Sequence, residues 1–178
     1  MEPVATPVTS QLPAETWEAY PLVSPGKFIA LCLFTLGLYG LWWQYKTWRF
    51  FKQWQQTDTW PAARAIFSLF TLNELLKTIN QFACHSGGYT PIPNPGGLVT
   101  GYVIVSLLSR LPDPLWLASL GAFGFLVPGY RAFRDAMLQA PAYGGYDQDY
   151  FNTRQLILMS VCFVCWSLLI IGLTMGEA

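Results

Sequence analysis

Four apolar runs separated by polar segments form the main pattern of the chain. They cover residues 28–45, 98–111, 115–130 and 155–175. As α-helices, the first would rise about 27 Å and the last about 31 Å, close to the thickness of the hydrocarbon core of a bilayer. The second would rise only about 21 Å, and the segment Pro112-Asp113-Pro114 separates it from the third. The pattern predicts four transmembrane helices, with the second and third forming a tight helical hairpin.

Residues 62–81 show a different pattern, with apolar and polar side chains on opposite faces of a helix. Pro61 suits the first turn of this helix, and Asp58 and Thr59 are suitable caps before it. A lone span with a polar face is costly in hydrocarbon, whereas such a helix is stable between headgroups and acyl chains. We therefore expect an amphipathic interfacial helix. Its apolar face carries Ala65, Leu69, Leu72, Leu76 and Ile79.

The N-terminal segment differs from the rest of the chain in composition. Residues 1–24 are rich in Pro, Thr and acidic residues and contain no Lys or Arg. We expect a polar N-terminal tail over residues 1–24 and a single membrane domain over residues 25–178. The predicted fold class is all-α, a polytopic integral membrane protein with four transmembrane helices and one amphipathic interfacial helix.

The composition of the chain favours a membrane environment. Hydrophobic residues make up 53% of the sequence and charged residues 11%, whereas soluble domains average about 25% charged residues. Aromatic residues reach 16%, with eight Trp, and Trp and Tyr concentrate at membrane–water interfaces. The formal net charge is zero, which argues against nucleic acid as a partner. The expected partners are membrane lipids and other membrane protein subunits.

The basic residues predict an orientation. If residues 62–81 lie on the membrane surface, eight Lys and Arg residues fall on one side of the four spans, and Lys27 and Arg110 fall on the other. If residues 62–81 span the membrane, the split is five against five. Cytoplasmic loops carry an excess of Lys and Arg. The first arrangement is therefore favoured, and it places both termini on the non-cytoplasmic side.

Arg110 and Asp113 flank the turn of the predicted hairpin. Charged groups near membrane depth are costly unless they are paired or reach the interface. Their spacing allows a salt bridge that caps the hairpin, and this structural role is favoured over solute binding.

Two cysteine-containing segments raise the question of a metal or redox site. Cys162 and Cys165 share one face of the last predicted span, and Cys84-His85 follows the amphipathic segment. Two thiols at this spacing can share a metal, but desolvation within the span opposes the thiolate that this chemistry needs. Packing is the favoured role, and no metal or cofactor is predicted.

Small residues and a basic aromatic segment indicate contacts with helices and lipids. Small residues at short spacing allow close helix packing, and basic residues beside a span contact lipid headgroups. The candidate packing positions are Gly37, Gly40, Gly97, Gly101, Ala118 and Ala122. The candidate headgroup contacts are Lys46, Arg49 and Lys52.

The first apolar run also carries a motif of the form T-x-G-x-Y-x-x-x-W, at Thr35, Gly37, Tyr39 and Trp43. With the segments 20–28, 64–67 and 110–116, it resembles a group of uncharacterised bacterial inner-membrane proteins. The resemblance extends over about residues 20–172. It implies the bacterial inner membrane as the location and carries no activity.

The sequence contains no common catalytic motif and a single His. The leading functional hypothesis is therefore a non-enzymatic membrane protein, an accessory or assembly subunit of a larger membrane complex. One alternative is a small-solute transporter or a lipid-handling membrane protein. The second alternative is a metal or haem redox membrane protein that uses Cys84, His85, Cys162 and Cys165.

Overall fold

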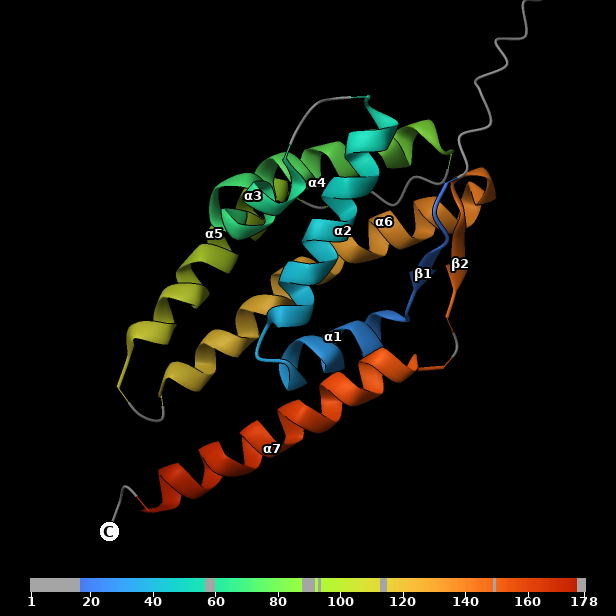
Figure 1. Cartoon of the computed structure of the whole chain (residues 1–178). Helices are drawn as coiled ribbons and strands as arrows, with labels where there is room; N and C mark the ends of the chain where they lie inside the picture. Colours follow the sequence, from blue (N-terminus) through green and yellow to red (C-terminus); the bar gives the residue numbers. More distant parts are fainter. Residues whose placement is uncertain are drawn as a thin grey trace, which may run out of the picture.

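The computed structural model describes residues 17–56, 60–87, 92, 94–112, 115–148 and 150–175. It is mostly helical, which confirms the all-α part of the predicted fold class, with one small parallel sheet (Figure 1). The α-helices are α1 (Pro25–Phe34), α2 (Leu38–Trp54), α3 (Pro61–Ile66), α4 (Ser68–His85), α5 (Pro95–Leu107), α6 (Val127–Gln139) and α7 (Thr153–Met175). The 3₁₀ segments are η1 (Leu108–Arg110), η2 (Leu115–Leu126) and η3 (Pro141–Tyr143), and the strands are β1 (Tyr20–Leu22) and β2 (Gly145–Asp147).

The first apolar run is broken into two helices. α1 ends at Phe34 and α2 begins at Leu38, so the expectation of one continuous helix over residues 28–45 is wrong. At the break Gly37 has φ = 92°, a left-handed conformation that favours glycine. The Thr35 hydroxyl bridges the two helices, because it donates to the Leu31 carbonyl at 2.7 Å and accepts from the Tyr39 N–H at 3.0 Å.

Both flanks of this run lie at the same end of the molecule. Glu18, which precedes α1, forms a 2.5 Å ion pair with Arg49 of α2. The Tyr20 and Thr47 hydroxyls lie 3.3 Å apart and are hydrogen-bonded. In Figure 1, α1 leads away from β1 and α2 turns back beside it. The run is therefore a helical hairpin that begins and ends on one side.

Aromatic rings fill the core on that side. The buried ring of Phe133 on α6 lies within 5.4–6.1 Å of the rings of Tyr20, Phe50, Phe51 and Phe82. Offset and edge-to-face pairs of this kind add about 0.5–1.5 kcal/mol each beyond burial of their area. The core thus joins β1 to α2, α4 and α6.

The segment before α1 is part of this core. Tyr20, Leu22 and Val23 are almost fully buried, and the Val23 carbonyl accepts a 2.6 Å hydrogen bond from the Tyr130 hydroxyl. The Tyr20 N–H donates to the Gly144 carbonyl at 2.9 Å, next to the β1–β2 pairing. The predicted polar tail over residues 1–24 is therefore wrong from Trp17 onward, and residues 1–16 lie outside the described part.

The predicted amphipathic helix over residues 62–81 is present as α3 and α4, which are separated at Phe67. α4 packs against α6, α5 and α2. The apolar face of α4 is covered by protein, whereas Ile66, Phe67 and Phe70 at the junction of α3 and α4 are exposed. The fully buried residues on this face are Leu72, Leu75, Leu76, Ile79 and Phe82.

The second and third apolar runs form a helical hairpin. α5 and η1 lie side by side with η2, and the chain continues without a break into α6, past the predicted end of this run at residue 130. A Cβ added at Gly101 of α5 would overlap the ring of Phe125 on η2. Glycine at this position therefore permits the close contact.

α7 is the most exposed of the apolar elements. Of the helices the structure describes, it alone is long and apolar enough to cross a bilayer, with mean hydropathy 2.2 and 6% of its residues buried over Gln155–Gly172. Its indole at Trp166 donates to the Phe34 carbonyl at 3.1 Å, which fixes α7 beside α1. Burial in a soluble core does not explain its composition, because most of the described large apolar side chains on it are more than half exposed.

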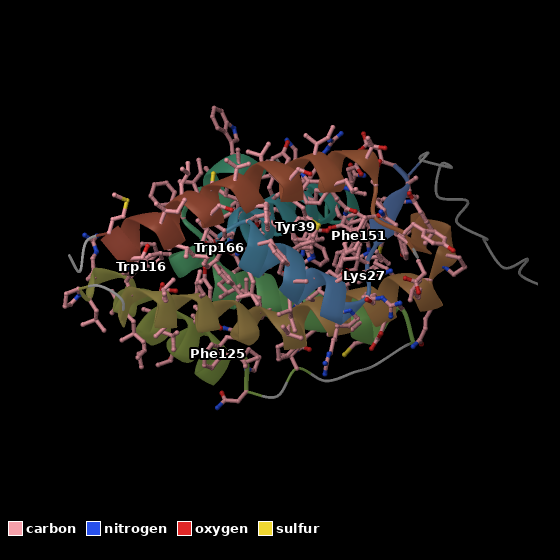
Figure 2. The ribbon with its side chains drawn as sticks, turned by 90° about the horizontal axis from the view of Figure 1, so that it is seen from below. Lys27, Tyr39, Trp116, Phe125, Phe151 and Trp166 are labelled. Carbon is pink, nitrogen blue, oxygen red and sulfur yellow. The ribbon has the colours of Figure 1, made fainter. Side chains whose placement is uncertain are left out.

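The apolar elements point away from a polar end. The far ends of α5 and α7 lie at one end of the molecule, and β1, β2 and the ends of α4 and α6 lie at the other (Figure 1). Figure 2 places Trp116 of η2 at the same end as the C-terminal part of α7. We refer to the end that carries β1 and β2 as the polar end.

Substitution of Gly37 by Ala should destabilise the fold. The new Cβ would be forced into a left-handed backbone and would overlap the Phe123 ring, so the free energy of unfolding should fall by about 2 kcal/mol or more. Thermal unfolding in mild detergent measures the change. The matched control is Gly26→Ala, because a Cβ there meets nothing within 4 Å. Equal midpoints for the two variants would contradict the tight turn.

Candidate functional site

A groove of about 550 Å³ opens between the first half of α2, β2 and the N-terminal end of α7. Ligand sites usually have volumes of about 300–1,000 Å³. The polar residues that line it are Tyr39, Lys46, Tyr146, Gln148, Asn152 and Gln155, and the apolar ones are Ala19, Pro21, Leu38, Trp42 and Leu158. The groove is therefore amphipathic.

Lys46 provides the positive charge of the groove. Its Nζ lies 4.5 Å from the centroid of the Tyr20 ring and 4.9 Å from that of the Trp42 ring. Such cation–π contacts contribute about 0.5–2 kcal/mol, and more when the cation is desolvated. Within the described ranges, Lys46 has no acid within ion-pair distance, since Glu18 pairs with Arg49. Desolvation by burial lowers the pKa of Lys46, an effect that the charge of Glu18 partly opposes.

A hydrogen-bonded network of side chains forms the wall opposite Lys46. The Gln155 Oε1 accepts from the Asn152 N–H at 2.9 Å and from the Gln148 Nε2 at 3.1 Å. Tyr39 lines the same groove as Gln155. The network fixes the start of α7 to the segment after β2, and Figure 2 shows Tyr39 beside the N-terminal half of α7.

Gln148 connects the groove to the small sheet. Its backbone N–H donates to the Leu22 carbonyl at 2.8 Å, directly after the β1–β2 pairing. The groove wall is therefore anchored in the same core that holds the α1–α2 hairpin closed.

The groove has the composition of a binding site. The described residues that line it include no His, Cys, Asp or Glu, and these are the side chains that most often act as catalytic nucleophiles, bases or metal ligands. What the groove combines is one cation, several amide and hydroxyl groups and an apolar wall. An amphiphile with a polar head and an apolar body matches this combination.

The predicted headgroup contacts take different positions. Lys46 lies in the groove, and Arg49 is paired with Glu18 beside it. Lys52 lies in the last turn of α2. At the hairpin, Arg110 is exposed at the end of η1, and Asp113 lies outside the described residues, so the predicted Arg110–Asp113 pair remains a prediction.

The predicted packing positions divide into two groups. Gly37, Gly101 and Ala122 lie in tight contacts, and Gly40 lies at ordinary van der Waals distance from Leu126. Ala118 is exposed. A Cβ at Gly97 would meet the side chain of its own helix cap, Asn94, rather than another helix.

The structure does not bring the cysteine and histidine candidates together. Cys84 and Cys165 are exposed, and Cys162 is buried. The ring of His85 lies 6.0 Å from that of Trp54. No group of three or more His, Cys, Asp or Glu side chains suited to a metal occurs among the residues described.

Sequence reasoning missed most of the groove. Tyr39 and Trp42 belong to the first apolar run, and Gln148 and Asn152 precede the last run, which begins at Gln155. The only local signal is the concentration of amides directly before the last apolar run. Nothing in the sequence indicates that these amides face α2.

Comparisons with known proteins add no identification. No family model matches the chain, and neither a curated protein nor a solved structure shows a significant match. The resemblance to bacterial inner-membrane proteins therefore remains a prediction.

The amine of Lys46 should lose its proton more readily than an ordinary lysine. Because burial lowers its pKa from the usual 10.5, the folded protein holds this proton less tightly than the unfolded chain does. The contribution of Lys46 to the free energy of unfolding should thus increase as the pH rises toward 10.5. The pH profile of amine acylation, followed by mass spectrometry of the Lys46 peptide, should have its midpoint below that value. A midpoint at or above 10.5 would contradict the desolvated position.

Proposed function

We propose that the protein is an integral membrane protein whose polar end lies at one membrane surface. In this arrangement α7 crosses the bilayer, the α5–η2 hairpin enters it from the polar end, and the α1–α2 hairpin dips into it and returns. The support is the exposed apolar surface of α7 and the common direction of these elements (Figure 1). This proposal replaces the four spans expected from sequence, because the first run returns to its starting side.

The charges of the chain support this arrangement. Arg110 lies at the end of the apolar hairpin, whereas Lys46 and Arg49 of α2 contact Tyr20 and Glu18, and Arg134 of α6 pairs with Asp147 of β2. The Arg64 guanidinium lies 4.4 Å from the Trp48 ring on the second half of α2. An excess of basic residues marks the cytoplasmic side. The polar end and the segment before α1 would thus be cytoplasmic, and the C-terminal end of α7 would lie across the membrane.

Within that arrangement, the function that the geometry supports best is non-enzymatic binding of an amphiphile, a lipid-handling role. The main observation in support is the groove of about 550 Å³. It is lined by Lys46 and by the amide side chains of Gln148, Asn152 and Gln155, and also by the apolar side chains of Leu38, Trp42 and Leu158. Leu158 lies near the start of the exposed apolar helix. The groove would therefore be reached from the bilayer, at the level where headgroups meet acyl chains.

Other roles remain hypotheses. An accessory subunit of a larger complex would expose apolar surface as well, but lipid accounts for that surface without a protein partner. Co-purification in mild detergent tests the accessory role. A transport role at Arg110 gains no support from the groove, which is lined by other residues.

Cysteine labelling should place the two flanks of the first run on one side. In a variant with the four native Cys changed to Ser, single Cys at Glu18 and Gln53 should react with a membrane-impermeant maleimide from the same side of oriented vesicles. Cys at Ser109 or Thr174 should react from the opposite side if the hairpin and α7 reach it.

The four-span arrangement gives the opposite result for the first pair. It places Glu18 and Gln53 on different sides, so reaction of these two positions from opposite sides would exclude the α1–α2 hairpin in the membrane. Labelling after permeabilisation is the control for accessibility.

Filling the groove should reduce lipid binding. Leu158→Trp places a larger ring on the apolar wall, and we expect several-fold less lipid retained after purification in mild detergent, as counted by native mass spectrometry. Leu168→Trp is the matched control, because Leu168 is on the same helix and is 64% exposed. Equal retention by both variants, or no retained lipid in the unaltered protein, would contradict the proposed function.

A further inference from the structure

We infer that the groove selects an anionic amphiphile and that Lys46 binds its phosphate or carboxylate group. This inference rests on the proposed function, since it names the class of ligand for the same groove. The observation behind it is a half-buried ammonium group held on two aromatic rings, without an acidic partner in the described part of the chain.

The ammonium group of Lys46 is the positive charge of the groove. Burial costs an ammonium group much of its hydration, and the two rings replace only part of that loss. The nearby carboxylate of Glu18 is 2.5 Å from Arg49 and is therefore already paired. An anion placed in the groove would complete the coordination of Lys46, whereas a cationic ligand would be repelled.

The side-chain amides of Gln148 and Asn152 are neutral donors in the same groove. The Gln148 amide is used within the protein, because its Nε2 donates to the Tyr150 carbonyl and to the Gln155 Oε1. The side chain of Asn152 lines the same groove and makes no hydrogen bond to the residues described. Its amide is therefore available as a donor to a phosphate or carboxylate oxygen beside Lys46.

The apolar wall of the groove would contact the apolar body of the ligand. The apolar wall of Leu38, Trp42 and Leu158 suits the part of an amphiphile next to its headgroup. The rest of an acyl chain would lie along the exposed apolar side chains of α7, in the bilayer. A free inorganic anion would leave this wall in contact with water, so the apolar wall favours a lipid source for the anion.

The experiment compares lipids that differ in headgroup charge. The full chain, purified in mild detergent, is exchanged into mixtures of phosphatidylglycerol and phosphatidylcholine with matched acyl chains, and retained lipid is identified by native mass spectrometry. We expect the unaltered protein to prefer phosphatidylglycerol. Lys46→Gln should reduce that preference about fivefold, the effect expected for one lysine near an anionic headgroup.

Two further variants separate charge from fold. Lys77→Gln removes one positive charge from an exposed position of α4 and should leave the preference unchanged. Lys46→Arg keeps the charge and should restore most of the preference. A matched fatty acid in place of phosphatidylglycerol tests whether a carboxylate is accepted as well as a phosphate.

The outcomes distinguish this inference from the proposed function. Equal retention of the two phospholipids by the unaltered protein, or an unchanged preference in Lys46→Gln, would overturn the anionic selectivity while Leu158→Trp still reports on the groove. Absence of any lipid that depends on Leu158 would instead overturn the groove as an amphiphile site.

Discussion

The attachment of the segment before α1 to the aromatic core is the constraint on which the rest of the structure depends. The Tyr130 hydroxyl donates to the Val23 carbonyl at 2.6 Å, and the rings of Phe28 and Tyr130 stack at 4.1 Å. These contacts fix the start of α1 beside α6. Because Arg49 and Thr47 of α2 are bound to the same segment, the chain must turn between α1 and α2. The turn at Gly37 is thus required by contacts at both ends of the hairpin.

The division into a polar end and an apolar part follows from this constraint. α2 carries Trp43, Trp48, Phe50 and Phe51 back into the core, and α4 buries the face that carries Leu72, Leu75, Leu76, Ile79 and Phe82 on the same core. The apolar surface that remains exposed lies mainly on α7, around α3 and the start of α4 (Trp60, Ile66, Phe67 and Phe70), and on parts of α1, α5 and the start of α2. The molecule is therefore asymmetric along its length, with polar groups gathered at one end. The proposed arrangement, in which this end lies at one membrane surface, requires such an asymmetry.

Hydropathy predicted the helical class and each apolar run, because the content of apolar residues is a local property. It did not predict the break at residues 35–37, since Thr35 and Gly37 are common in membrane helices and their effect here depends on the ring of Phe123 from η2. The amphipathic period of residues 62–81 correctly indicated a helix with one apolar face. Whether protein or lipid covers such a face is not encoded in the period, and α6 covers it here. The groove could not be predicted for the same reason, as its walls come from residues about a hundred positions apart.

Lys46 connects the fold to the proposed role. Had residues 28–45 formed one straight helix, Lys46 would follow it into the headgroups as one of several solvated cations. The reversal at Gly37 instead brings Lys46 against Tyr20, which precedes α1, and opposite the amides at the start of α7. The same backbone turn therefore folds the first apolar run back on itself and places a half-buried cation beside an apolar wall. Burial costs the Lys46 ammonium part of its hydration, and no acid among the described residues lies within ion-pair distance of it, so the anion that we propose would complete its surroundings.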